Sequence, residues 1–269
     1  MIPGISGIFI GITLVISLIV PLLCPIVFAR RERGRGITGA WLAGALGFLI
    51  PQMLIRIPIL SILQSSAGFS AFSAGHPFAF VLALAFTAGL FELAGRISAA
   101  LLLQKRPTFS RALAAGMGHG GIESIILVGI SYAVDLICVL LVRSGADVTA
   151  QQALIDVLAS TPPALFLLAG FERLLTMLCH CAISCVVCCG IWRKRPLPGL
   201  AFCLIFHTLL DGLAGISQLI GQNLPQAAAY ALTYTILTIF AAISLWILKT
   251  LPGRWPEEDT REVDHASKI

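Results

Sequence analysis

Residues 116–124 read GMGHGGIES and lie inside a long apolar run. This stretch brings His119 and Glu123, four residues apart, into a region that should be hydrocarbon. Residues four apart on a helix share one face, so both side chains can point toward one site. Ionisable groups inside a membrane are costly and therefore indicate a functional site. The surrounding glycines leave room for another backbone or a ligand, and we expect those at 118, 120 and 121 to admit a substrate backbone.

The composition indicates a polytopic membrane protein. Of its 269 residues, 58% are hydrophobic and 12% are charged, and the mean hydropathy is +0.94. A soluble domain is nearer a quarter charged. Seven apolar runs of about 20 residues or more are each long enough to cross roughly 30 Å of hydrocarbon. We therefore expect an all-α transmembrane helix bundle with spans at about residues 7–29, 38–55 (with an interfacial extension to 63), 77–103, 112–142, 164–192, 200–220 and 227–248.

The positions of the basic residues predict the orientation of the bundle. Fourteen of the 18 Lys and Arg residues fall in segments on one side of the membrane, namely 30–35, 105–111, 193–195 and 249–268. Only Arg56 and Arg143 fall on the other side. The excess of basic residues in cytoplasmic loops places the N-terminus outside and the C-terminus in the cytoplasm. Near the outer end of the second span, we expect Gln52 and Arg56 to cap the helix and snorkel toward water.

This pattern predicts one transmembrane domain, residues 1–251, followed by a polar and disordered cytoplasmic tail, residues 252–269. We expect a multi-pass protein of the cell membrane, the inner or cytoplasmic membrane, with the lipid bilayer as its surroundings. The net charge of +5 is explained by this topology, so no nucleic-acid partner is expected.

Polar residues interrupt four of the predicted spans at a similar depth. At about 1.5 Å per residue, six of them fall within about 10 Å of depth in the cytoplasmic half of the membrane. They are Glu92, His119, Glu123, His180, His207 and Asp211. Arg96 lies one turn from Glu92, whereas Glu172 lies higher and is expected to pair with Arg173 or a hydroxyl. Any one of these residues alone is explained by hydrogen bonds between helices, but three histidines and three carboxylates at one level favour a site.

At these residues the sequence resembles the YhfC family of intramembrane metalloproteases. This family is related to the CPBP group, which includes the CAAX prenyl endopeptidases and bacteriocin-immunity-type membrane proteases. The resemblance covers about residues 75–215. It rests on the GHGGIES stretch, on Glu92-x-x-x-Arg96, on Phe171-Glu172-Arg173 with His180 downstream, and on His207-x-x-x-Asp211. The CPBP group usually has two adjacent glutamates in the first motif, whereas Phe91 precedes a single Glu92 here. The resemblance implies hydrolysis of a peptide bond in or near the membrane.

We therefore predict an intramembrane protease with a cavity open to the cytoplasmic side. Either Glu92, oriented by Arg96, or Glu123 would activate a water. Asp211 would fix a histidine tautomer or serve as a further ligand. Three histidines would hold Zn²⁺ or, in a glutamic-type peptidase without metal, stabilise the oxyanion and protonate the leaving amine. These are His119, His180 and His207.

The expected substrate is a membrane protein or a lipidated peptide. Two other functions remain open. The first is a proton- or cation-coupled transporter, because histidine and carboxylate chains inside a membrane also form proton relays. The second is a non-catalytic, immunity-type membrane protein that keeps the fold without the chemistry.

Overall fold

The computed structural model describes residues 2–32 and 35–255, and all regular structure among these residues is helical. Seven helical stretches are long and apolar enough to cross a membrane, which confirms the predicted spans. The first three spans consist of α1 (Gly4–Leu14), η1 (Val15–Ile19) and α2 (Val20–Arg31), then α3 (Ile37–Phe48), η2 (Leu49–Arg56) and α4 (Ile57–Gln64), then α6 (Pro77–Leu103). The last four consist of α7 (Phe109–Ser124), η3 (Ile125–Gly129) and α8 (Ile130–Ser144), then α10 (Pro163–Trp192), α11 (Pro196–Gly221) and α12 (Gln226–Thr250).

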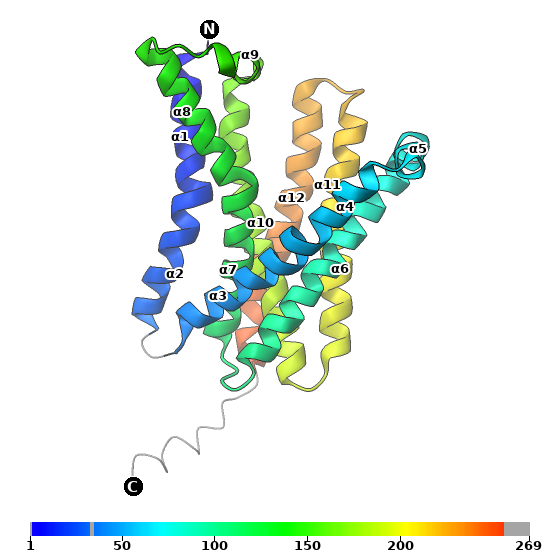
Figure 1. Ribbon diagram of the computed structural model, residues 1–269. Coiled ribbons are helices and arrows are strands. Elements are labelled where there is room, and N and C mark those ends of the chain that lie inside the picture. The colour runs from blue at the N-terminus through cyan, green and yellow to red at the C-terminus, as the bar shows by residue number, and fades with distance from the viewer. Residues whose placement is uncertain (1, 33–34, 256–269) are drawn as a thin grey trace.

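The spans alternate in direction, so the start of α1 and the end of α12 lie at opposite ends of the bundle (Figure 1). We call the end where α2, α6, α10 and α12 finish the basic end, because the basic segments lie there. The other end, called here the distal end, carries two short helices that the sequence did not predict, α5 (Ala67–Gly75) and α9 (Gln152–Ser160). Large apolar side chains such as Leu102 and Trp246 are exposed on the outside, as expected of a surface that contacts lipid.

The second span crosses the front of the bundle obliquely, from the basic end toward α5 (Figure 1). Its middle part, η2, is a π-helix that contains Pro51. Proline has no N–H to donate to the carbonyl of Gly47, so the regular α-helical ladder is interrupted there. The carbonyl of Gly47 lies against α6, where a Cβ on Gly95 would clash with it.

Small residues let α7 pack backbone to backbone against its neighbours. A Cβ on Gly118 would collide with the carbonyl oxygen of Trp41 in α3, and a Cβ on Gly120 would lie 2.9 Å from the Cβ of His180. The expectation that these glycines admit a substrate backbone is therefore wrong. The space beside Gly118, Gly120 and Gly121 is filled by α3, α10 and α2 respectively, so small residues are required there for helix packing.

The packed structure continues past residue 251. The short turn η5 (Pro252–Arg254) is followed by Trp255, whose Nε1 donates a hydrogen bond to the carbonyl of Pro107 at 2.9 Å. The ring of Trp255 also meets that of Trp192, with ring centroids 5.6 Å apart. The remainder of the expected tail, residues 256–269, lies outside the described residues.

Candidate active site

Ionisable side chains from four spans meet at one level inside the bundle. They are Glu92 and Arg96 from α6, His119 and Glu123 from α7, Arg173 and His180 from α10, and His207 and Asp211 from α11. All except Asp211 are at least nine-tenths buried. The expected convergence of three histidines and three carboxylates is therefore present, and two arginines complete it.

Glu92 lies at the centre of this cluster. Its Oε2 accepts hydrogen bonds from Nη1 of Arg96 at 3.2 Å and from Nε2 of His119 at 3.0 Å. Its Oε1 lies 3.3 Å from Nε2 of His207. An ionised carboxylate can only accept, so Nε2 of His119 carries the proton. The other ring nitrogen of His119, Nδ1, is then left with a free lone pair, and it is buried without a hydrogen-bond partner in the described structure.

His180 is held between Arg96 and Glu123. Nη2 of Arg96 lies 2.6 Å from its Nδ1, and Oε2 of Glu123 lies 2.6 Å from its Nε2. A guanidinium only donates, so Nδ1 of His180 accepts and Nε2 carries a proton toward Glu123. The ring also stacks on that of His119, with centroids 5.3 Å apart. The neighbours of His180 thus select its tautomer and orient its ring.

Arg173 is a cluster residue that the sequence analysis assigned to a local pair only. The predicted ion pair with Glu172 is present, but Nη1 of Arg173 also donates to Oε1 of Glu123 at 3.1 Å. Charge balance could have predicted this contact. A buried carboxylate such as that of Glu123 requires a nearby cation, and Arg173 is a cation within the spans. Arg96 forms an ion pair with Glu92, and Arg173 forms one with Glu123. The histidines need not carry charge, and neutral imidazole is the form that binds metals.

Three of these residues fit a metal ion. Glu92, His119 and His180 each offer one ligand atom, and these atoms lie within 4.8 Å of one another. One carboxylate with two imidazoles is a donor set found in catalytic zinc sites. The unpartnered Nδ1 of His119 supports the fit. His207, expected as the third histidine ligand, is outside this group and lies instead against Oε1 of Glu92.

Asp211 connects the cluster to a cleft. Its Oδ2 lies 3.4 Å from Nε2 of His207, and its side chain is 41% exposed. The cleft has a volume of about 300 Å³ and lies between η2, α6 and α11, on the distal side of Glu92. It is also lined by Gln52 and Arg56, which are 9% and 7% exposed. These two residues face the interior, so the expectation that they snorkel toward water is wrong.

On the basic side of His119 lies a cavity of about 10 Å³. A water molecule needs roughly that much room, so this cavity admits no substrate. The contact between Gly44 and the backbone of Ala115, both of which line the cavity, closes the bundle there. We expected a cavity that opens toward the basic loops. The small cavity on that side admits no substrate, and the larger cleft lies on the distal side of Glu92.

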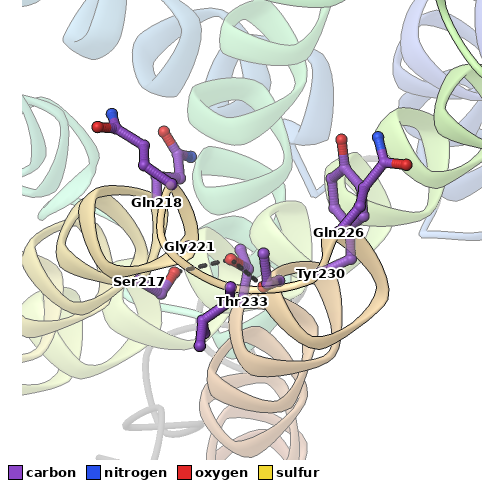
Figure 2. Close-up of a pocket in the computed structure, with 9 residues that line it drawn as sticks. Ser217, Gln218, Gly221, Gln226, Tyr230 and Thr233 are labelled. Atoms are coloured by element: carbon purple, nitrogen blue, oxygen red, sulfur yellow. Dashed lines mark hydrogen bonds between the residues drawn. The ribbon is translucent and has the colours of Figure 1, made fainter.

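A second pocket of about 330 Å³ lies between α11 and α12 near their connecting loop (Figure 2). The hydroxyls of Ser217 and Thr233 are 2.7 Å apart at its edge, and Gln218, Gln226 and Tyr230 add neutral polar groups. None of the residues that line it belongs to the buried cluster. We therefore assign the candidate active site to the cluster around Glu92 and not to this pocket.

Comparison with known proteins yields a family match and one relative. The chain matches the model of a family described as YhfC intramembrane metalloprotease over residues 16–232, a range that includes every residue of the cluster. A protein of Bacillus subtilis (strain 168), named "Uncharacterized membrane protein YhfC", is 25% identical over 265 residues. The alignment covers 93% of this chain and 98% of the relative. No solved structure matches the chain.

Proposed function

Since the chain belongs to the YhfC intramembrane metalloprotease family, we propose that it hydrolyses a peptide bond of a membrane protein or a lipidated peptide. The observation that carries this proposal is the buried group of Glu92, His119 and His180, which combines a metal-binding donor set with a membrane-embedded fold. Such a site needs no soluble domain, because the four spans supply the reacting groups directly.

The first part of the proposal concerns metal binding. Glu92, His119 and His180 would hold a zinc ion, which supplies a Lewis acid that polarises water and a peptide carbonyl. Glu123 would act through His180, since a carboxylate on the second ring nitrogen of a histidine ligand orients the ring and raises its basicity. Glu123 is itself fixed by Arg173. This contact engages Oε1, and Oε2 lies 2.6 Å from Nε2 of His180, so we assign Glu123 to positioning His180.

The second part concerns proton transfer. Nε2 of His207 lies 3.3 Å from Glu92 and 3.4 Å from Asp211, so it can carry a proton between these two carboxylates. Asp211 faces the cleft, through which a substrate and water would arrive. We assign to Asp211 and His207 the removal of a proton from water and its delivery to the leaving amine.

A comparison of membrane proteomes tests this function. Membranes that contain the wild-type protein should yield new protein N-termini by mass spectrometry, and membranes that contain Glu92→Gln should lack them. Glu172→Gln is the matched control, because Glu172 lies outside the proposed chemistry and should leave the pattern unchanged. Identical N-termini in wild-type and Glu92→Gln membranes would exclude peptide hydrolysis at this site.

One observation favours the transporter as a second candidate. Ion-pair and hydrogen-bond contacts run without a break from Asp211 through the cluster to Glu172, and these two end residues are 41% and 36% exposed in their side chains. Arginine does not release its proton, so a relay could run only along the titratable part of this chain, from Asp211 through His207, Glu92 and His180 to Glu123. Proton flux into proteoliposomes that contain a pH-sensitive dye distinguishes a transporter from a protease. Proton flux that is lost in Glu92→Gln would favour transport, whereas absence of both flux and new N-termini would favour an immunity-type protein.

A further inference from the structure

The cleft beside Asp211 contains a buried cation that forms no ion pair, although the carboxylates of Asp211 and Glu92 are close enough to act on its charge. Arg56 is 7% exposed, and both of its hydrogen bonds go to neutral groups. No carboxylate of residues 2–32 or 35–255 forms an ion pair with it, whereas Arg96 in the same bundle pairs with one carboxylate and Arg173 pairs with two. A buried charge is costly unless it is paired, so an anion supplied from outside would relieve this cost.

The guanidinium of Arg56 is fixed so that one edge stays free. Its Nε donates to Oγ1 of Thr87 at 3.2 Å, and its Nη2 donates to the carbonyl of Leu84 at 2.7 Å. Its Nη1 makes no hydrogen bond to any described residue. Both anchors belong to α6, which forms one wall of the cleft. The side chain is therefore held in place before any ligand arrives, which lowers the entropic cost of binding.

Gln52 adds a second unsatisfied group to the same cleft. It lies four residues before Arg56 on η2 and is 9% exposed. Its Oε1 is buried and makes no hydrogen bond in the described structure. The remaining walls are mostly apolar, with Val81, Ala85 and Ala88 among them. The cleft thus offers the cation of Arg56 and the carboxylate of Asp211 in a mostly apolar space of about 300 Å³, a volume typical of a small ligand site.

We propose that this cleft is a substrate subsite that binds a carboxylate of the peptide beside the bond to be cleaved. Arg56 would hold the carboxylate, because a guanidinium matches this group in charge and geometry. Asp211, which lines the same cleft, would repel the carboxylate and so keep it on Arg56. The inference rests on the proposed function, and the carboxylate could belong to an acidic side chain or to the C-terminus of the substrate.

Binding of short peptides to the purified protein in detergent micelles tests the subsite. The probes are acetyl-Leu-Leu-Leu with a free carboxylate, its C-terminal amide, and acetyl-Leu-Glu-Leu-amide, with octyl phosphate as a lipid-like anion. We expect one carboxylate peptide or both to bind at least about tenfold more tightly than the neutral amide, which corresponds to about 1.4 kcal/mol. The free acid reports on a terminal carboxylate, and the Glu peptide reports on a side chain.

Two variants should abolish this preference. Arg56→Gln removes the charge, and Gln52→Glu supplies an internal carboxylate that would occupy Arg56 while keeping its anchors to α6. The second variant keeps the test decisive if Arg56→Gln fails to fold. Arg143→Gln is the matched control, because Arg143 donates to the carbonyl of Gly4 away from the cleft and should leave the preference unchanged.

Three results would overturn the proposal. They are equal binding of the carboxylate and amide peptides, a preference that persists in both variants, and binding of octyl phosphate alone among the anions. The readout is binding and not cleavage. Carboxylate binding that depends on Arg56 without any new N-termini in membranes would therefore keep the subsite and reject the protease. New N-termini without a carboxylate preference would support the protease and reject the subsite.

Discussion

Arg96 places a guanidinium nitrogen 2.6 Å from Nδ1 of His180. The same guanidinium reaches Oε2 of Glu92 at 3.2 Å, so a cation already lies between two of the three residues that fit a metal ion. Arg96 therefore plays two roles in this structure. It neutralises Glu92, and it competes for the ligand atoms that a metal would need.

This competition predicts that Arg96→Met binds zinc more tightly than the wild type. The variant frees Nδ1 of His180 and leaves Glu92 without its cation, and both changes favour an added metal. We expect an increase in affinity of at least about tenfold, or about 1.4 kcal/mol, in a titration against a competing chelator. Arg143→Met, outside the cluster, should match the wild type. Weaker zinc binding by Arg96→Met would mean that Arg96 supports the metal site instead of competing with it.

Single histidine variants should show which histidines bind zinc and which one only lies beside the site. His119→Ala and His180→Ala should each lose zinc, because each removes one of three donors in the group with Glu92. His207→Ala should retain zinc, since His207 lies outside that group. Elemental mass spectrometry of the purified protein gives the metal content. His76→Ala, at the exposed start of α6, is the control.

Retention of zinc in both His119→Ala and His180→Ala would contradict the assignment of the metal to this cluster. It would point instead to the eight cysteines, of which all but Cys24 are buried.

Asp211→Asn should slow cleavage and leave the zinc content unchanged. Asparagine keeps the size of the side chain but cannot take a proton from His207, and general acid–base catalysis contributes about 100- to 10,000-fold. The rate at which new N-termini appear in membranes measures the loss. Asp135→Asn, on α8 away from the cluster, is the matched control. A normal rate in Asp211→Asn would remove the Asp211–His207 pair from the proton path.

Gly118→Ala should destabilise the bundle. The added methyl group would collide with the carbonyl of Trp41, and overpacking of this kind costs about 1–3 kcal/mol. Gly39→Ala on α3 meets nothing within 4 Å and should be neutral or slightly stabilising, because alanine is the better helix former. Thermal unfolding in detergent compares the two variants. Equal melting temperatures would show that α3 and α7 can separate without cost.

Much of the fold could be predicted from hydropathy and charge. The seven spans follow from apolar length, and the level of the cluster follows from counting residues from the basic segments. The short helices α5 and α9 were missed because they lie in loops and lack a long apolar run. The expected outside position of the N-terminus stays a prediction.

The candidate site was predictable in its residue types but not in its pairings. The i, i+4 spacing correctly predicted the contacts of Glu92 with Arg96 and of His207 with Asp211. Contacts between spans, such as Arg173 with Glu123, depend on helix rotation, which the nearly all-apolar spans do not reveal. Arg56 was misassigned for a related reason. Because Arg56 lies near the predicted end of a span, we expected its side chain to reach water. The second span instead continues for eight more residues as α4, and Arg56 lies against α6.

The oblique second span also constrains how the chain is made. Its main packing partners, α6 and α7, are synthesised after it, and the groups that accept hydrogen bonds from Arg56 lie on α6. A nascent chain that has released only two spans from the translocon would therefore hold Arg56 in lipid without these acceptors. Packing of the third span against the second supplies them. Correct biogenesis of this protein thus depends on the order of helix association as well as on hydropathy.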